Sequence, residues 1–343
     1  MQPEQTKKIN IKELARLLSL STATVSKALK DSYEISEQTK KKVQEAALQY
    51  NYTPNPYASS LRKKKSKTIA VVLPEVDDNY FSLAIKGIQT IAEEKGYHLL
   101  MYLSHEKLSI EKTIMDACTS GRVDGVLISI SKESNTATHL NQLIAEQIPV
   151  VFFDRAMDSF EAPKVITNDY ESGYEGAKIL LNKGCKKPVF LSVSSNLPIS
   201  NLRAEGFVNA LKDSGFKKNA DEQVIYCDNS DQENYNSIKK LLKSKKKPDG
   251  IVASVEHLAM QVYFACQELG LTIPDDVMVI AFSSLEIAPI LNPSLSTITQ
   301  PAFETGKKAA EMLFANIEKP GKVKSTETVI LPTEYFERGS TRK

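Results

Sequence analysis

The stretch that decides the fold of the N-terminal part spans residues 11–29 and reads IKELARLLSLSTATVSKAL. Its first half places apolar side chains at the i, i+3, i+4 and i+7 spacing of one helical face: Ile11, Leu14, Ala15 and Leu18. Ser21 is a favourable N-cap for a second helix, Thr22 to Leu29. The small Ala15 lets the two helices cross closely, and Leu20 fills the turn. The pattern predicts a helix-turn-helix, a motif that inserts its second helix into the DNA major groove.

The outer face of the predicted second helix carries short or flexible side chains. Lys27 can donate to O6 and N7 of guanine, whereas Thr22 and Ala23 can contact thymine methyl groups. The hydroxyl groups near the helix N-terminus suit phosphate oxygens, which set the register of binding rather than its sequence preference: Ser21, Thr24 and Ser26. The alternative is an ordinary solvated three-helix unit.

Positive charge is concentrated in this head. The 343-residue chain has a net charge of only +2, but residues 1–67 hold 14 Lys and Arg against six Asp and Glu, a net charge of +8. The remaining residues carry a net charge of −6. A third helix, capped by Ser36 and running from Glu37 to Tyr50, completes a head of about 50 residues. A basic head on a mildly acidic body indicates a polyanionic partner for the head alone.

From Thr68 onward, apolar strands alternate with helical segments. The apolar runs begin near Ile69, Leu99, Val126, Val150, Val189, Val224, Ile251 and Val277. Helical segments between them include Ser82–Lys95, Gly173–Lys183, Arg203–Ser214 and Leu258–Leu269. Repeated βα units predict an α/β fold of parallel sheets covered by helices on both faces. Because about 270 residues exceed one comfortable α/β domain, we expect two similar lobes.

Several classes of function have no support in the sequence. Nucleotide-binding glycine loops, the zinc-protease motif and the hydrolase nucleophile elbow are absent, and the four histidines are dispersed. The four cysteines are single, so we expect buried reduced thiols rather than disulfides or zinc ligands. We therefore expect no catalytic residues, no metal and no cofactor. Without an apolar leader or a run long enough to span a membrane, we expect a cytoplasmic protein with no membrane partner.

The head resembles that of the LacI/GalR family of bacterial transcription regulators, and the likeness covers essentially the whole chain. The family's head reads I-K-D-V-A-x-x-A-G-V-S-x-x-T-V-S-R-x-L-N, followed by V/I-S and later by Y-x-P-N-x-x-A-x-x-L. The matching residues are Ile11, Lys12, Ala15, Ser21, Thr24, Val25, Ser26, Leu29, Ile35, Ser36, Thr39, Tyr52, Pro54, Asn55, Ala58 and Leu61.

Two residues depart from that pattern. Ser19 replaces the family's turn glycine, so either Ser19 adopts a positive φ at a cost of about 1 kcal/mol or the turn differs. Lys27 replaces the family's arginine and lacks its planar fork, which softens the preference for guanine.

The resemblance implies a short hinge helix at residues 55–62, ordered only when two chains meet on DNA. Leu61 would wedge into the central base step of the minor groove and bend it, and Arg62 would lie against the narrowed groove. About two helical turns are marginal alone in water, so a plain linker is the alternative. The candidate DNA-contacting residues are Ser21, Thr22, Ala23, Thr24, Ser26, Lys27, Lys30, Tyr52, Asn55, Leu61 and Arg62.

For the body, the resemblance implies an effector domain with the fold of periplasmic sugar-binding proteins: two α/β lobes, three crossovers and a ligand in the cleft beyond the strands' carboxyl ends. The candidate effector-binding residues are polar or aromatic side chains just past apolar strands or in family-like segments: Tyr80, Phe81, Asp154, Arg155, Ser200, Arg203, Glu256, Ser283 and Gln300.

The alternative roles of these residues are structural. Asp154 and Arg155 could form a surface ion pair, and Arg203 could interact with a helix dipole or be a strut between lobes. Tyr80 and Phe81 could belong to the core. The body also departs from its relatives: Val255-Glu256 stands where they commonly have Asn-Asp, and Ser283 stands where many have Asp. An amide and a carboxylate that would bind ligand hydroxyls are therefore missing.

We expect an all-α head at residues 1–53, a hinge helix and linker at 54–67, and an effector-binding and dimerisation domain at 68–340. Within the latter we expect a first lobe at about 68–162 and 299–318, and a second at about 163–298 and 319–340.

The expected function is that of a homodimeric repressor that binds a near-palindromic operator in double-stranded DNA and is controlled by a small-molecule effector, a sugar or sugar derivative. A regulator controlled by a protein partner or a non-sugar ligand is the main alternative. A transport solute-binding protein and an enzyme on the same architecture are weaker ones, because neither would use a basic head.

Overall fold

The computed structural model describes residues 9–53, 65–76, 79–216, 220–228, 230–319 and 326–342. The chain divides into two compact units, residues 1–64 and 65–343, and each is described by itself. Within the described residues, no helix is both long enough and apolar enough to span a bilayer.

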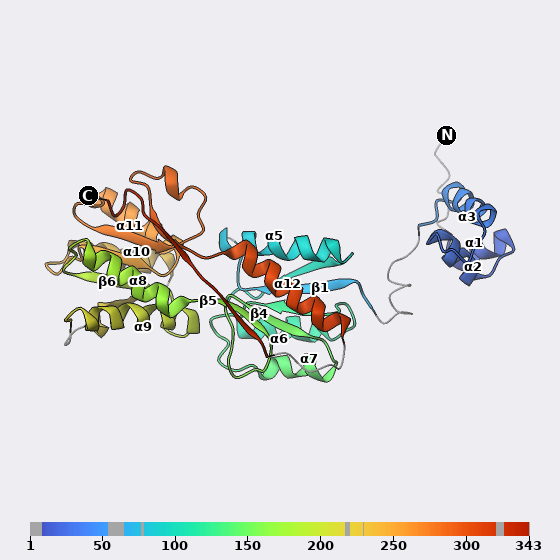
Figure 1. Ribbon diagram of the computed structural model, residues 1–343, viewed down its shortest axis with the longest axis horizontal. Coiled ribbons are helices and arrows are strands. Elements are labelled where there is room, and N and C mark those ends of the chain that lie inside the picture. Colours follow the sequence, from blue (N-terminus) through green and yellow to red (C-terminus); the bar gives the residue numbers. More distant parts are fainter. Residues whose placement is uncertain are drawn as a thin grey trace. The chain divides into compact units, whose positions relative to one another are not determined.

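Residues 9–53 form the three helices that the sequence predicts (Figure 1). They are α1 (Ile11–Leu18), α2 (Thr22–Leu29) and α3 (Glu37–Gln49). Their inward faces share one small core of Leu14, Ala15, Val25, Ala28, Val43, Ala46 and Ala47. The two predicted serine caps are confirmed: the Ser21 side chain accepts from the backbone N–H of Thr24 at 3.0 Å, and Ser36 accepts from Thr39 at 3.3 Å.

The turn between α1 and α2 contains a strained residue. Ser19 has a φ of 53° and a ψ of 39°, the left-handed conformation that favours glycine. Its backbone N–H donates to Arg16, and the N–H of Leu20 donates to Ala15. The turn therefore keeps its positive φ without a glycine, which is the first of the two alternatives that the sequence left open.

The body contains two six-stranded sheets, in the orders β11-β5-β4-β3-β1-β2 and β12-β10-β9-β8-β6-β7. The first sheet comprises β1 (Thr68–Leu73), β2 (His98–Leu103), β3 (Val126–Ile128), β4 (Val150–Phe153), β5 (Lys164–Thr167) and β11 (Thr328–Leu331). The second comprises β6 (Pro188–Ser192), β7 (Val224–Tyr226), β8 (Gly250–Ala253), β9 (Met278–Phe282), β10 (Ser296–Thr299) and β12 (Glu334–Phe336). The pairs are parallel except β10 with β12. The predicted α/β class is confirmed.

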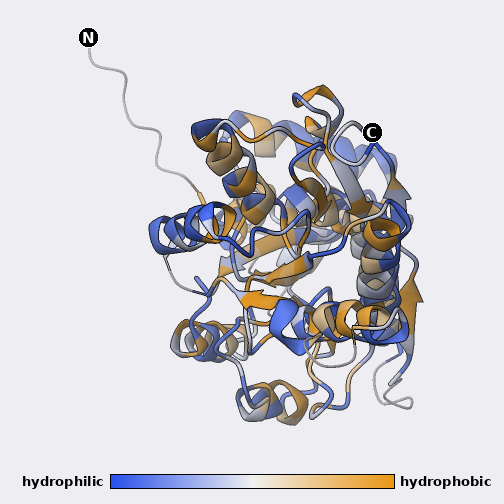
Figure 2. Ribbon diagram, turned by 90° about the vertical axis from the view of Figure 1, so that its left-hand side faces the viewer, coloured by the Kyte–Doolittle hydropathy of each residue, from blue (hydrophilic) through white to orange (hydrophobic). Residues whose placement is uncertain are grey.

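Helices cover both faces of each sheet. Those of the first lobe are α5 (Asn79–Glu94), α6 (Leu108–Cys118), α7 (Asn141–Ala145) and α12 (Ala302–Glu318). Those of the second are α8 (Asp169–Asn182), α9 (Pro198–Asp213), α10 (Asp231–Lys243) and α11 (Glu256–Leu269). Successive side chains of β1 enter different cores, with Ile69 and Val71 on one face and Ala70 and Val72 on the other. Figure 2 shows mainly hydrophobic strands between helices whose outer faces are hydrophilic.

The sheets shift the expected lobe boundaries. Lys164 of β5 pairs with Phe152 of β4, and Thr328 of β11 pairs with Lys164. Residues 164–167 and 328–331 therefore lie in the first lobe, whereas we had expected the second lobe to begin at about 163 and to include 319–340. The chain passes between the lobes after β5, after β10 and after β11, which gives the three expected crossovers.

Two pairs of helices pack unusually closely, α5 with α12 and α8 with α9 (Figure 1). In the second pair, a Cβ atom on Gly173 would lie 1.9 Å from the backbone oxygen of Arg203. A Cβ atom on Gly206 would lie 1.9 Å from the backbone oxygen of Tyr170. Glycine at both positions is therefore what brings the backbone of α9, and with it Arg203, against α8.

We expect Gly173→Ala to destabilise the body by about 1–3 kcal/mol, because the added methyl group would collide with backbone that cannot move independently. Gly176→Ala on the same helix is the matched control. Its Cβ would meet only side-chain ends at 3.2–3.5 Å, so the gain in helix propensity should leave stability unchanged or slightly higher. Urea unfolding followed by circular dichroism measures both, and equal effects of the two variants would contradict this account.

We expect Ser19→Gly to stabilise the head by roughly 0.5–1 kcal/mol, because glycine adopts the left-handed conformation without strain. Hydrogen exchange of the α1 and α2 amides in the full chain should slow accordingly. Ser32→Gly, in the loop after α2 and without a positive φ, should not slow exchange. Faster exchange in Ser19→Gly would show that the left-handed conformation of Ser19 does not lower the stability of the head.

Candidate functional site

The predicted DNA-reading side chains of α2 are wholly or partly accessible. Ser21, Thr22, Ala23, Lys27 and Lys30 are exposed, and Thr24 and Ser26 are half-buried. The hydroxyl groups of Ser21 and Thr24 also lie within hydrogen-bonding distance of each other, at 2.9 Å.

The other predicted DNA-contacting residues do not join this group. Tyr52 is half-buried and packs against the head core, and burial raises the pKa of its hydroxyl. Asn55, Leu61 and Arg62 lie outside the described residues, and so does most of the predicted hinge and linker.

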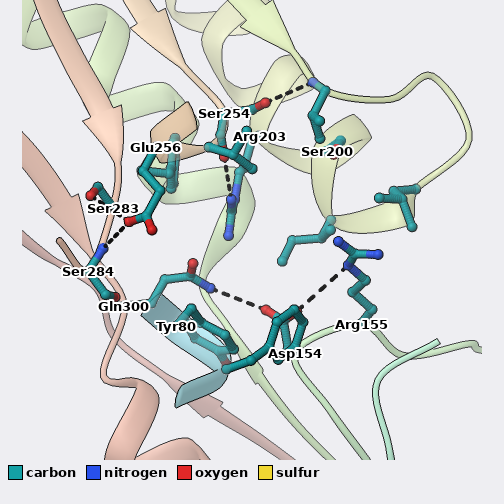
Figure 3. A pocket seen from close by; sticks show the side chains of 16 residues that line it. Tyr80, Asp154, Arg155, Ser200, Arg203, Ser254, Glu256, Ser283, Ser284 and Gln300 are labelled. Atoms are coloured by element: carbon teal, nitrogen blue, oxygen red, sulfur yellow. Dashed lines mark hydrogen bonds and ion pairs between the residues drawn. The ribbon is translucent and has the colours of Figure 1, made fainter. Parts of the chain in front are cut away.

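All nine predicted effector-binding residues line one cavity between the two lobes of the body (Figure 3). They are Tyr80, Phe81, Asp154, Arg155, Ser200, Arg203, Glu256, Ser283 and Gln300. They come from the first turns of α5 and α11, from the first two turns of α9, and from the ends of β4, β9 and β10. The cavity thus lies at the carboxyl ends of strands from both sheets, where an open α/β fold places its ligands. Its volume of about 40 Å³ leaves room for a few waters only.

The helices that supply these residues begin earlier than predicted. α5, α8, α9 and α11 start two to five residues before the expected positions. The first turns of α8 and α11 begin with acidic residues, so the apolar helical pattern on which the prediction rests starts later than the helix itself. In each helix the missed first turn carries a residue in or beside the cavity: Tyr80, Asp169, Ser200 and Glu256.

Arg203 is the most constrained of these residues. Its side chain is 5% exposed, its Nε donates to Oδ1 of Asp169 at 2.8 Å, and its Nη1 donates to the backbone oxygen of Ser254 at 2.9 Å. Its guanidinium lies 4.1 Å from the centre of the Phe282 ring. Because Asp169 and Ser254 both belong to the second lobe, Arg203 is not the strut between lobes that we considered.

One donor of Arg203 remains unused. Nη2 is buried and has no hydrogen-bond partner among the residues that the structure describes. Figure 3 shows the guanidinium directed into the cavity. Burial raises the pKa of Asp169, while the adjacent guanidinium acts in the opposite direction and favours the carboxylate. The arrangement holds a positively charged donor at the cavity with its geometry already fixed.

Asp154 and Arg155 are fixed at the end of β4. Asp154 has a φ of +61°, a strained conformation for a residue other than glycine. Its Oδ1 accepts from Nε2 of Gln300 at 3.5 Å, and Arg155 donates to both carboxylate oxygens of Glu106 at 2.8 and 3.1 Å. Both side chains are largely buried at the cavity, so the alternative of a surface ion pair is not what the structure has.

Tyr80 and Phe81 lie where the core of the first lobe meets the cavity. Both belong to the apolar core of the first lobe, and both line the cavity. Their rings meet edge to face with centres 5.4 Å apart. Burial raises the pKa of Tyr80 well above its ordinary value, so its hydroxyl stays protonated.

Glu256 links the two lobes across the cavity. We call the group formed by Glu256, Asn79 and Ser284 the cross-cleft bridge. Glu256 Oε1 accepts from the backbone N–H of Asn79 at 3.2 Å, and Oε2 accepts from Ser283 Oγ at 2.9 Å and from the Ser284 N–H at 3.3 Å. The Asn79 side chain also donates to the backbone oxygen of Ser284. Asn79 belongs to the first lobe and the others to the second.

The sequence analysis missed three residues that support the cavity: Asn79, Glu106 and Asp169. Asp169 and Glu106 follow the strands β5 and β2 within a few residues, so the rule that selected Asp154 could have found them. Asn79 stands next to the aromatic pair of α5. All four cysteines are free and buried, as expected. Among the described residues, no group of three or more His, Cys, Asp or Glu side chains is placed to hold a metal ion. Burial raises the pKa of Cys118 to about 12.

Two family models match the chain. Residues 10–55 match the model of bacterial regulatory proteins of the lacI family. Residues 66–339 match the model of periplasmic binding proteins and the sugar-binding domain of the LacI family. The second match alone covers most of the chain. The protein belongs to the lacI family.

This lacI-family protein has relatives over nearly its whole length. It is 30% identical to the ribose operon repressor of Bacillus subtilis (strain 168), covering 97% of this chain and 98% of the relative. It is 26% identical to the transcriptional repressor CytR of Escherichia coli (strain K12), covering 97% and 96%. The Lac repressor dimer bound to operator and the anti-inducer ONPF has the same fold, with a TM-score of 0.83, 20% identity and coverage of 98% and 99%.

Members of this family are transcriptional regulators, and the lacI-family protein described here is a DNA-binding transcriptional regulator with an effector domain. The resemblance inferred from the head motif is confirmed, and so is the architecture of a helix-turn-helix head on a two-lobed body of the periplasmic-binding-protein type.

We expect Glu256→Ala to loosen the closed cleft, because it removes the acceptor for the Asn79 N–H and for the Ser283–Ser284 turn. Hydrogen–deuterium exchange of the peptide that contains Asn79 should accelerate several-fold. Glu304→Ala, at an exposed position in the first turn of α12, is the control with the same change of charge and should leave that peptide unchanged. Unaltered exchange in Glu256→Ala would mean that the cross-cleft bridge does not hold the lobes.

Proposed function

We propose that this regulator is a cytoplasmic repressor that acts as a homodimer on a near-palindromic operator and responds to a small molecule in the interlobe cavity. The relatives named as repressors and the Lac repressor dimer on its operator support the first part. The expected division into a head at 1–53, a hinge and linker at 54–67 and an effector domain at 68–340 belongs to this proposal.

In the head, the exposed surface of α2 is the part that contacts bases. Lys27 donates to guanine, and Thr22 and Ala23 contact thymine methyl groups. Phosphate contacts come from Ser21, Thr24, Ser26 and Lys30, with Tyr52 beside them. The proposed hinge residues Asn55, Leu61 and Arg62 act in the minor groove, where Leu61 kinks the central step.

The single observation that carries the effector proposal is the cavity itself. Nine side chains chosen from separate parts of the sequence line it, and a buried Nη2 of Arg203 points into it without an acceptor. An unpaired buried donor costs roughly 1–3 kcal/mol, which an incoming hydroxyl oxygen would recover. Carboxylates of Asp154 and Glu256 can accept from other hydroxyl groups of the same ligand. This combination suits a sugar or sugar derivative between the apolar faces of Phe81 and Phe282.

Charge favours an uncharged ligand. The guanidinium of Arg203 already faces Asp169 at 2.8 Å, and that of Arg155 faces Glu106 at 2.8 Å. Two further carboxylates, Asp154 and Glu256, line the same cavity. A phosphate group would enter a cavity with more carboxylates than guanidinium groups around it. We therefore propose a neutral sugar rather than a phosphorylated one.

The effector acts by changing how the lobes close. A ligand larger than the cavity of about 40 Å³ requires the lobes to move apart, which breaks or lengthens the contacts of the cross-cleft bridge. The shift of the first lobes in a dimer then changes whether two hinges can pair on DNA. Such coupling is typically about 1–3 kcal/mol, or roughly 5–150-fold in operator affinity.

A body that responds to a protein partner or a non-sugar ligand is the second candidate. The observations that favour it are the apolar Val255 and the serine at position 283, because a bidentate pair for vicinal hydroxyls is missing there. A panel of sugars, sugar phosphates and nucleosides, each added to the full-length protein in a thermal-shift assay, separates the candidates. Stabilisation by a neutral sugar supports the first, and no stabilisation by any member overturns it.

We expect Arg203→Ala to abolish the response to the effector found in that panel while leaving operator affinity without effector unchanged, because Arg203 belongs to the body and its hydrogen bonds go to Asp169 and Ser254 of the second lobe. The operator is first selected from a random duplex library, and affinity is measured by fluorescence anisotropy with and without effector. Lys212→Ala, at an exposed position in the last turn of α9, is the control. A preserved response would remove Arg203 from the binding site.

A further inference from the structure

An ion pair lies on the candidate DNA-reading surface. The Nζ of Lys27 contacts the carboxylate of Glu34, and the two side chains are 49% and 46% exposed. Lys27 is the long cationic side chain near the end of α2 that we propose as the reader of guanine. Glu34 follows it in the loop before α3 (Figure 1), and the sequence analysis gave it no role.

The backbone of this loop holds Glu34 beside the helix. The N–H of Ser32 donates to the backbone oxygen of Lys27 at 3.1 Å, and the N–H of Ile35 donates to Ser32 at 3.2 Å. The side chain of Ile35 packs against the head core, and Ser36 then caps α3. Glu34 is therefore anchored on both sides, so its carboxylate stays within reach of Lys27 even though both side chains are accessible.

The neighbouring acids of the head have other tasks. Asp31 and Glu37 both contact Lys40 at 2.7 Å. Glu13 accepts from the backbone N–H of Asn10 at 2.8 Å and completes the cap of α1. Glu34 instead contacts a proposed reader of base edges, and this singles it out as part of the recognition surface.

A carboxylate on this surface weakens sequence-independent binding to DNA. Phosphates repel it, and a lysine already paired with a carboxylate neutralises a phosphate less effectively. Glu34 therefore costs affinity on every duplex unless a base offers it a donor. Such a penalty on wrong partners is a source of specificity.

One arrangement of bases offers that donor together with acceptors for Lys27. In the major groove, guanine presents N7 and O6 as acceptors, and the cytosine paired with it presents its N4 amino group as a donor. O6 and N4 are hydrogen-bonded to each other, so they lie about as far apart as the lysine nitrogen and carboxylate oxygen of an ion pair. In an A·T pair the donor is the N6 amino group of adenine. A Glu34 carboxylate that accepts from N6 would lie beside the acceptor N7 of the same base, which repels it.

We propose that Lys27 and Glu34 together read one G·C base pair in each half-site, with Lys27 on O6 and N7 of guanine and Glu34 accepting from N4 of its cytosine. Glu34 is thus a specificity-determining residue. The inference rests on the proposed role of Lys27 as a base reader.

The test is selection from a randomised duplex library with the full-length protein and its variants. The wild type should select an invariant G·C pair at one position in each half-site. Glu34→Ala should relax that position and also bind an unrelated duplex several-fold more tightly. Because Lys27 becomes free to neutralise a phosphate, the slope of log affinity against log salt should steepen by about one per head. An exposed ion pair adds little stability, so the variant should remain folded.

Glu45→Ala is the matched control, because it removes the same charge from an exposed position on α3. It should leave the selected sequence unchanged. A selected sequence for Glu34→Ala identical to that of the wild type would overturn the proposal. Lys27→Ala separates this outcome from failure of the underlying role: if it too leaves the selected sequence unchanged, Lys27 does not read bases at all. If only Lys27→Ala relaxes the position, Lys27 reads the base alone and Glu34 has no share in it.

Discussion

The ion pair between Arg203 and Asp169 is the interaction on which the cleft depends. It holds a buried guanidinium whose Nη1 and Nε are satisfied by the second lobe and whose Nη2 is open to the cavity. Removing the charge of either partner would leave the other buried without compensation, which is far more costly than losing an exposed pair. The pair exists only because α9 lies directly on α8, and that contact requires glycine at 173 and 206. The close approach of the two helices thus allows the buried ion pair, and the ion pair in turn fixes the guanidinium at the cavity.

Local patterns in the sequence predicted much of this molecule. Helical spacing and serine caps located the head helices, and polar residues after apolar strands, together with segments that resemble the family's, located nine side chains that share one cavity. A cap, a helical face and a strand end are short-range features, each set by a few neighbouring residues. The strand-end rule could have added Asp169, which comes two residues after β5.

What the sequence did not predict is set by contacts between distant residues. β5 and β11 are four residues long and are assigned to the first sheet by two ladders, β5 with β4 and β11 with β5. The hydrophobic pattern of so short a strand does not indicate which sheet it joins, or at which edge. The cross-cleft bridge joins Asn79 and Glu256, far apart in the chain, and the pair of Lys27 and Glu34 depends on how a loop folds back on its helix. Ser19 was predicted in part. The missing glycine indicated that a positive φ would strain the backbone, but it did not indicate that the turn would keep this conformation.

The order of strands has a consequence for synthesis of the chain. β11 and β12 form an edge of each sheet, and the residues 338–341 that follow β12 hydrogen-bond within the second lobe. The ribosome makes these segments after the head, on the order of tens of seconds later at ordinary elongation rates. The head, whose apolar core is drawn from residues 9–52, can fold in that interval. A nascent chain therefore carries a folded DNA-binding module before it has the means to sense a metabolite.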